Sequence, residues 1–146
     1  MDLRYLTPDF AVAPQIALEE IAEAAKRGFR TLINNRPDEE VDASLSHEVL
    51  QAAAAAAGLA YVHLPYYPGE LTADLIEGFE TALASAQKPV LAWCRSGTRS
   101  SHLWAMSQAG VLPLDEIVQN AKNAGYDLGA LVPMMRAKAA SKTAET

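Results

Sequence analysis

Residues 89–105, PVLAWCRSGTRSSHLWA, constrain the fold of this chain more than any other stretch. The run 89–93 is continuous, apolar and of strand length, as strands buried on both faces of a parallel sheet tend to be. A polar turn follows at once and begins with Cys94, the only cysteine of the chain. A helical pattern then starts at residue 99. The stretch therefore predicts a strand, a tight turn and a helix in direct succession.

The other segments alternate between helical and strand patterns. Ser46 and Thr72 are suited to cap two of the helices. Helices are expected over 16–28, 46–58, 72–86, 99–110, 113–125 and 128–140, strands over 29–35, 60–67 and 89–93, and an edge strand near 3–6. This alternation predicts an α/β fold with a central, mainly parallel sheet flanked by helices on both faces. We expect one domain over residues 1–140 and a flexible tail over 141–146.

Composition excludes several classes of function. The formal net charge of −6 over 146 residues argues against a nucleic-acid-binding surface, which needs clustered Lys and Arg. One cysteine cannot form an internal disulfide. The start has no signal-peptide pattern, and no apolar run is long enough to span a membrane. No His, Cys and Asp spacing suits a metal, and no cofactor motif is present. A cytoplasmic enzyme or binding domain is expected, without nucleic-acid or membrane partners.

The turn after residue 93 is the candidate active site. Ligands of α/β sheets bind beyond the carboxyl ends of the strands, where Cys94 stands. Successive backbone N–H groups of such a turn can form an anion-binding nest, and the following helix adds the positive end of its dipole. Gly97 permits a backbone conformation that a side chain would resist. The predicted anion-binding loop is Arg95, Ser96, Gly97 and Thr98.

Three side chains of this turn are predicted to be catalytic. The anion cradle favours a thiolate at Cys94, which would act as nucleophile. Arg99 would clamp the anion, and Ser100 could donate its hydroxyl to the thiolate or to a leaving sulfur. Arg95 is expected at the entrance, where it steers anions. The other interpretation is a buried structural cysteine, but two arginines beside it would be costly unless they face an anion.

A second polar turn is expected at the same edge of the sheet. Asn35, Arg36 and Asp38 lie where the strand predicted over 29–35 ends. They could form a wall of the pocket, with Arg36 paired to Asp38 or to substrate and Asp38 as a possible acid. A simple polar turn held by Pro37 explains the same residues equally well.

The sequence also resembles known families. CRSGTRS (94–100) is similar to the active-site loop of rhodaneses and to the phosphate loop of tyrosine and dual-specificity phosphatases. Residues 28–40, 55–72 and 93–110 together resemble the DUF442 family, the phosphatase-like domain of beta-lactamase-hydrolase-like proteins. That resemblance implies a dual-specificity/tyrosine-phosphatase-like fold. It also implies a possible partner, a metallo-beta-lactamase-fold persulfide dioxygenase, to which related domains are sometimes fused.

Three departures from the phosphatase pattern favour sulfur chemistry. Only four residues separate Cys94 from Arg99, where phosphatases have five, and Trp93 stands where phosphatases usually carry histidine. Ester cleavage also needs a general acid. The loop YYPGELT offers no aspartate before Asp74, and Glu70 is its nearest carboxyl. The helical C-terminal part, by contrast, follows the phosphatase pattern rather than the rhodanese one.

We therefore predict a cysteine-nucleophile enzyme that acts on a small anionic substrate. The preferred reaction is rhodanese-type sulfur transfer from thiosulfate or a small persulfide through a Cys94 persulfide. The alternative is a phosphatase that forms a phosphocysteine, with Glu70 or Asp38 as acid. A third possibility is a non-catalytic persulfide carrier or partner domain.

Overall fold

The computed structural model describes residues 1–145, with side chains through residue 142, and is built around one five-stranded sheet. The strands are β1 (Arg4–Thr7), β2 (Phe10–Ala13), β3 (Thr31–Asn34), β4 (Ala60–His63) and β5 (Val90–Trp93). Their order across the sheet is β1-β2-β5-β3-β4, with β1 antiparallel to β2 and the other neighbours parallel. The mainly parallel α/β fold predicted from the alternating pattern is thus confirmed.

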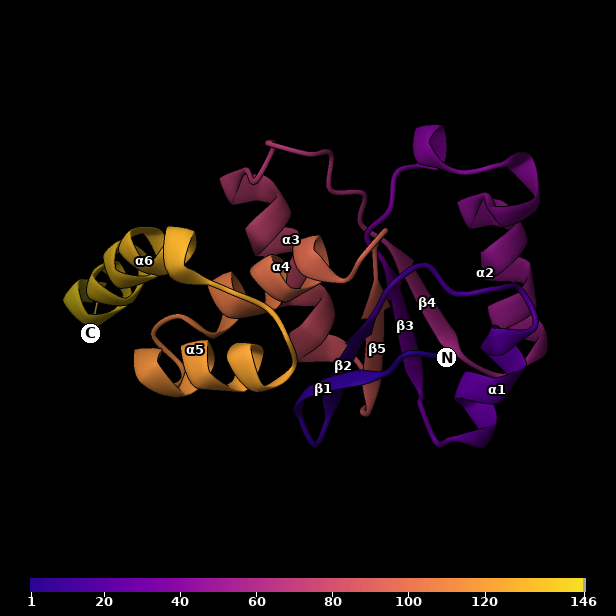
Figure 1. Ribbon diagram of the computed structural model, residues 1–146, viewed down its shortest axis with the longest axis horizontal. Helices are drawn as coiled ribbons and strands as arrows, with labels where there is room; N and C mark the ends of the chain where they lie inside the picture. Colours follow the sequence, from indigo (N-terminus) through magenta and orange to yellow (C-terminus); the bar gives the residue numbers. More distant parts are fainter. Residues whose placement is uncertain (146) are drawn as a thin grey trace.

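Helices cover both faces of the sheet, as Figure 1 shows. The helices α1 (Glu20–Lys26) and α2 (His47–Ala56) pack on one face, with a core that includes Ile21, Leu50 and Leu91. The other face carries α3 (Ala73–Ser85), α4 (Thr98–Gln108), α5 (Leu114–Asn123) and α6 (Val132–Glu145). Because helices cover it on both sides, β5 is buried at every residue, which explains its uninterrupted apolar sequence.

Most predicted elements are present, with shorter bounds. Ser46 and Thr72 cap α2 and α3 by accepting hydrogen bonds from the N–H groups of Val49 and Leu75. The predicted strand 60–67 leaves the sheet after His63. Short 3-10 turns, η1 (Asp38–Glu40), η2 (Ala43–Leu45) and η3 (Gly129–Leu131), lie in the connections.

Two segments differ from expectation. The strand β2 was not predicted, because only four residues between Pro8 and Pro14 carry its apolar pattern. The helix predicted over 128–140 continues as α6 as far as Glu145. The flexible tail predicted over 141–146 stays a prediction, and Thr146 lies outside the described residues. No helix within residues 1–145 has the length and apolar character needed to cross a membrane.

Candidate active site

The predicted nucleophile lies directly beyond the carboxyl end of the central strand β5. Cys94 has no exposed surface, and its Sγ accepts a hydrogen bond of 3.1 Å from the backbone N–H of Gly97. The parallel strands β2 and β3 flank β5 and fix its position through the full length of their registers. The sulfur therefore stands at the base of the loop, on a rigid part of the sheet.

The loop turns its backbone around the sulfur because Gly97 adopts a left-handed conformation, with φ of +92°. This residue is the N-cap of α4, whose first turn leaves amides without helical acceptors. Within the described part of the chain, no acceptor faces the N–H groups of Arg95, Ser96, Arg99 or Ser100. Together with the positive end of the α4 dipole, these amides form a cradle suited to an anion.

Two acceptor groups, the Glu40 carboxylate and the Tyr66 carbonyl, hold the guanidinium of Arg99 in one orientation. Its Nη1 donates to Glu40 Oε2 at 2.9 Å and to the Tyr66 carbonyl at 2.6 Å, and its Nη2 donates to Glu40 Oε1 at 2.7 Å. A guanidinium has five N–H donors in a planar fork. The two that remain, on Nε and Nη2, lie along the other edge and have no acceptor among the described residues. A bidentate edge is therefore left for an oxyanion.

Ser100 does not contact the sulfur as predicted. Its hydroxyl donates to Asn35 Oδ1 at 2.8 Å, and both side chains are fully buried. Asn35 in turn donates from its backbone to the Trp93 carbonyl and from Nδ2 to the Leu64 carbonyl. The pair thus links the ends of three strands to the first turn of α4. Buried polar groups need such partners, so the Ser100 hydroxyl is committed to this contact rather than to the thiol.

The predicted pairing of Arg36 with Asp38 is also not formed. Arg36 donates to the Glu40 side chain at 3.3 Å, to the Glu40 carbonyl at 3.0 Å and to Gln15 Oε1 at 3.2 Å. Asp38 instead accepts the backbone N–H of His47 at the start of α2, at 2.8 Å. The carboxylate that joins the second turn to the loop is Glu40, two residues further along the chain. The hydrogen bond from Arg99 is the main cause of the lowered pKa of this carboxylate, so Glu40 is ionised at neutral pH.

A hollow of about 730 Å³ opens above the loop and collects several of the predicted residues. Arg36, Arg95, Ser96, Thr98 and Arg99 line it. Glu40, Tyr66, Pro68, Gly69 and His102 complete the lining. Asp38 and Glu70, the two candidate acids, are not part of this lining. Among residues 1–142, whose side chains the structure describes, no cluster of His, Cys, Asp or Glu is arranged to hold a metal.

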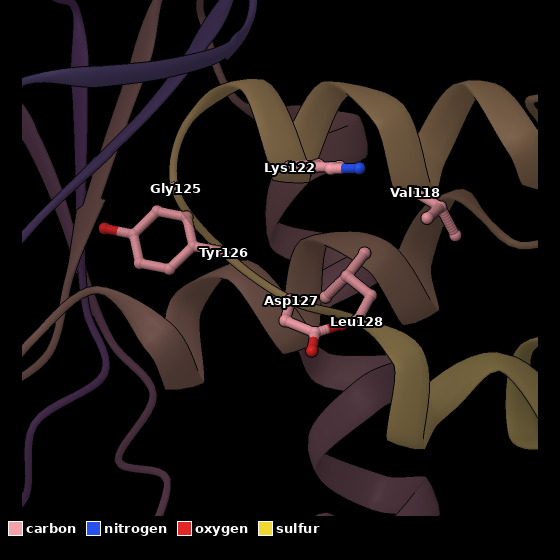
Figure 2. Close-up of a pocket in the computed structure, with 6 residues that line it drawn as sticks. All are labelled: Val118, Lys122, Gly125, Tyr126, Asp127 and Leu128. Atoms are coloured by element: carbon pink, nitrogen blue, oxygen red, sulfur yellow. The ribbon is translucent and has the colours of Figure 1, made fainter.

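Tyr126, in the segment between α5 and η3, contacts the Cys94 loop. Its hydroxyl donates to the Ser96 carbonyl at 3.2 Å, and a Cβ on Gly97 would collide with the same oxygen. A second hollow, of about 530 Å³, lies beside α5. In Figure 2 the Tyr126 hydroxyl points away from Lys122, Asp127 and Leu128, which line that hollow with it. The ring thus connects the C-terminal helices to the Cys94 loop.

Three residues of the site were missed from sequence: Glu40, His102 and Tyr126. His102 stands three positions after Arg99, and helical spacing could have placed both on one face of α4. Burial lowers the pKa of His102. Glu40 and Tyr126 meet the loop only through tertiary contacts, and no local pattern indicates them.

The chain is similar to known proteins over most of its length. Residues 2–111 match the family model described as beta-lactamase hydrolase-like protein, phosphatase-like domain. A beta-lactamase hydrolase-like protein of Xylella fastidiosa is 36% identical over 131 residues, which cover 88% of this chain and 30% of the relative. The chain thus spans about a third of the length of such relatives.

Solved structures give the same result for the fold. A Neisseria meningitidis protein provisionally named a phosphatase is 29% identical, with a TM-score of 0.80 and coverage of 94% of this chain and 99% of that one. A DUF442 protein of Shewanella putrefaciens, also provisionally named a phosphatase, has a TM-score of 0.72 at 20% identity, covering 99% and 90%. The predicted phosphatase-like fold and the predicted family are both confirmed. This chain belongs to the DUF442-type family of beta-lactamase hydrolase-like proteins, as their cysteine-phosphatase-like domain.

Proposed function

We propose that the chain is a cysteine-dependent phosphatase of small anionic substrates, with Cys94 as nucleophile. The main support is the placement of Arg99. Glu40 and Tyr66 bind one part of its guanidinium, its Nε and Nη2 edge has no acceptor among the described residues, and Arg99 lines the same hollow as Ser96 and Thr98. A phosphoryl group has three equatorial oxygens that need such donors while charge builds up on them. The family description and the solved structures support this reaction over the one favoured by the loop sequence.

The proposed reaction has two steps. The Cys94 thiolate attacks phosphorus, an S–P bond forms, and the P–O bond to the leaving group breaks with its electron pair staying on the leaving oxygen. Water then attacks the phosphocysteine, the S–P bond breaks, the electron pair returns to Sγ and a proton of the water passes to solvent or to the leaving group. Because Cys94 has no exposed surface, the loop must shift to admit the phosphoryl group. The amides of residues 95–100 and the free edge of Arg99 would hold the phosphoryl oxygens in both steps.

Sulfur transfer stays the second candidate, and a specific feature favours it. The loop has four residues between Cys94 and Arg99, the number found in the rhodanese-like pattern. In that reaction Sγ would attack the outer sulfur of thiosulfate, the S–S bond of thiosulfate would break and sulfite would leave. The third candidate uses the same Cys94 persulfide without catalysis. The chain would then be a persulfide carrier or partner domain for a metallo-beta-lactamase-fold persulfide dioxygenase. The relatives' additional length leaves room for such a fused domain.

Mass spectrometry and a phosphate assay on one preparation separate these reactions. We expect release of phosphate from an aryl phosphate by the wild type, no release by Cys94→Ser, and a phosphocysteine adduct of wild type after rapid acid quenching. Intact mass is also measured after brief incubation with thiosulfate. A gain of one sulfur that cyanide removes and that Cys94→Ser lacks, without any phosphate release, would overturn the phosphatase proposal in favour of sulfur transfer.

A further inference from the structure

The hollow above the loop carries a net positive charge. Three arginines line it, Arg36, Arg95 and Arg99, against the single carboxylate Glu40. This excess of two positive charges occurs in a chain whose net charge is −6. Glu40 and Tyr66 hold Arg99, whereas Arg95 is exposed and forms no ion pair with a carboxylate among residues 1–142, whose side chains the structure describes. An arginine so placed is suited to a second anionic group beyond the first.

Among the described residues that line the same hollow, no carboxylic acid is free to protonate a leaving group. Glu40 shares its two carboxylate oxygens between Arg99 and Arg36, which keeps it ionised. Asp38 accepts a hydrogen bond from the backbone N–H of His47 at the start of α2, and the exposed Glu70 lies outside the lining of the hollow. His102 and Tyr66 do line the hollow. Burial lowers the pKa of His102 and raises that of Tyr66, so the imidazole is mostly neutral at pH 7 and the phenol is a weak donor.

From these two features we infer that the substrate is a phosphoanhydride, in which the terminal phosphate of a diphosphate is cleaved. A diphosphate presents a second charged phosphate next to the one that reacts, and the exposed guanidinium of Arg95 could bind it. Its leaving group is itself a phosphate, a stable anion that departs without a proton, as a site without a general acid requires. The inference rests on the proposed phosphatase function and names its substrate class.

The electron balance of the step needs no further reactant. Sγ of Cys94 bonds to the terminal phosphorus, and the bond between that phosphorus and the bridging oxygen breaks. The electron pair stays on the bridging oxygen, which leaves as part of the remaining phosphate and faces Arg95. Water then displaces sulfur from phosphorus, the pair returns to Sγ, and the proton of the water passes to solvent.

The test compares leaving groups. We would measure kcat/KM for inorganic diphosphate, for a series of aryl monophosphates from strongly to weakly acidic phenols, and for an alkyl monophosphate. A general acid contributes roughly 10²- to 10⁴-fold. Without one, the alkyl phosphate should be at least about 100-fold slower than the most reactive aryl phosphate, and diphosphate should exceed the weakly acidic aryl phosphates. A flat dependence on the leaving group would overturn the inference and leave the phosphatase proposal intact.

Two variants test the second anionic position. Arg95→Gln should lower kcat/KM for diphosphate by about 5- to 10-fold, an effect moderated by solvent exposure. Its effect on aryl monophosphates, which lack the second phosphate, should be at least about 3-fold smaller than its effect on diphosphate. Arg30→Gln removes an exposed arginine at the opposite edge of the sheet and serves as the matched control. Equal losses on both substrate types would refute the role of Arg95. If none of the substrates gives phosphate release that depends on Cys94, the proposed function itself fails.

Discussion

Replacing Glu40 by glutamine tests the contact that organises the site. The change removes the charge from a carboxylate that accepts two hydrogen bonds from Arg99, at 2.9 and 2.7 Å, and one from Arg36 at 3.3 Å. The amide can still accept one of these bonds, but it cannot accept the paired donors of Arg99. The free edge of Arg99 should then lose its fixed direction, since only the Tyr66 carbonyl still holds it.

The structure sets the size of the expected effect. The Arg99 and Glu40 side chains are 14% and 25% exposed, so this ion pair lies between a buried pair, worth about 3–5 kcal/mol when broken, and a surface pair worth about 0–1 kcal/mol. We expect Glu40→Gln to lower the free energy of unfolding by about 2 kcal/mol. For a chain of this size that corresponds to a Tm lower by about 4–8 °C.

The catalytic effect should be larger than the effect on stability. Misdirecting a preorganised donor costs about 10- to 100-fold in rate, and we expect kcat/KM for an aryl phosphate to fall within that range. Thermal unfolding and steady-state phosphate release measure the two quantities. Glu39→Gln is the matched control, because Glu39 is the exposed neighbour and neutralises the same charge away from Arg99.

The pH dependence gives an independent check. The pKa of Glu40 is lowered in the folded chain, mainly by the hydrogen bond from Arg99, so its stabilisation is present above the ordinary glutamate pKa of about 4.3. It should be lost as the pH falls through the lower pKa of the folded state. The difference in unfolding free energy between wild type and Glu40→Gln should therefore be largest near pH 7 and shrink below about pH 4.

The kinetic measurement can refute the reasoning. If Glu40→Gln keeps kcat/KM within twofold of wild type, the positioning role of Glu40 is wrong.

Three further predictions concern the loop itself. Tyr126→Phe removes one hydrogen bond to the Ser96 carbonyl, so the unfolding free energy should fall by about 1 kcal/mol, measured by urea denaturation; no loss of stability would contradict the contact. Gly97→Ala should destabilise by about 2 kcal/mol or more and abolish turnover, because φ of +92° is strained for alanine and its Cβ meets the Tyr126 hydroxyl; retained activity would show that the loop adopts another turn. Alkylation of Cys94, followed by mass spectrometry, should be faster with anionic iodoacetate than with neutral iodoacetamide, and equal or reversed rates would argue against an anion cradle.

The central strand, the turn and the helix around Cys94 could be predicted because their determinants are local. The apolar run of β5 indicates burial on both faces of the sheet, and Gly97 takes the left-handed conformation that the turn requires. The short strand β2 has too few residues to give a periodic signal, and it becomes a strand only because β5 offers hydrogen-bonding partners along its whole length.

The contacts that give the site its chemistry could not be predicted in this way. Glu40 meets Arg99 across 59 positions, Ser100 meets Asn35 across 65, and Tyr126 meets Ser96 across 30. The sequence suggested Asp38 or substrate as the partner of Arg36, and the thiolate or a leaving sulfur as the acceptor of Ser100. In the structure Arg36 binds Glu40 and Gln15, and Ser100 binds Asn35. Whether Asp38 or Glu40 contacts Arg99 depends on how the 3-10 turn η1 packs against the loop. No local sequence pattern predicts that packing. The sequence by itself determined the proposed nucleophile, its strand and its turn, because neighbours along the chain create them. Only the tertiary structure decided which charges and hydroxyl groups pack around the Cys94 loop, because those partners are brought together by packing.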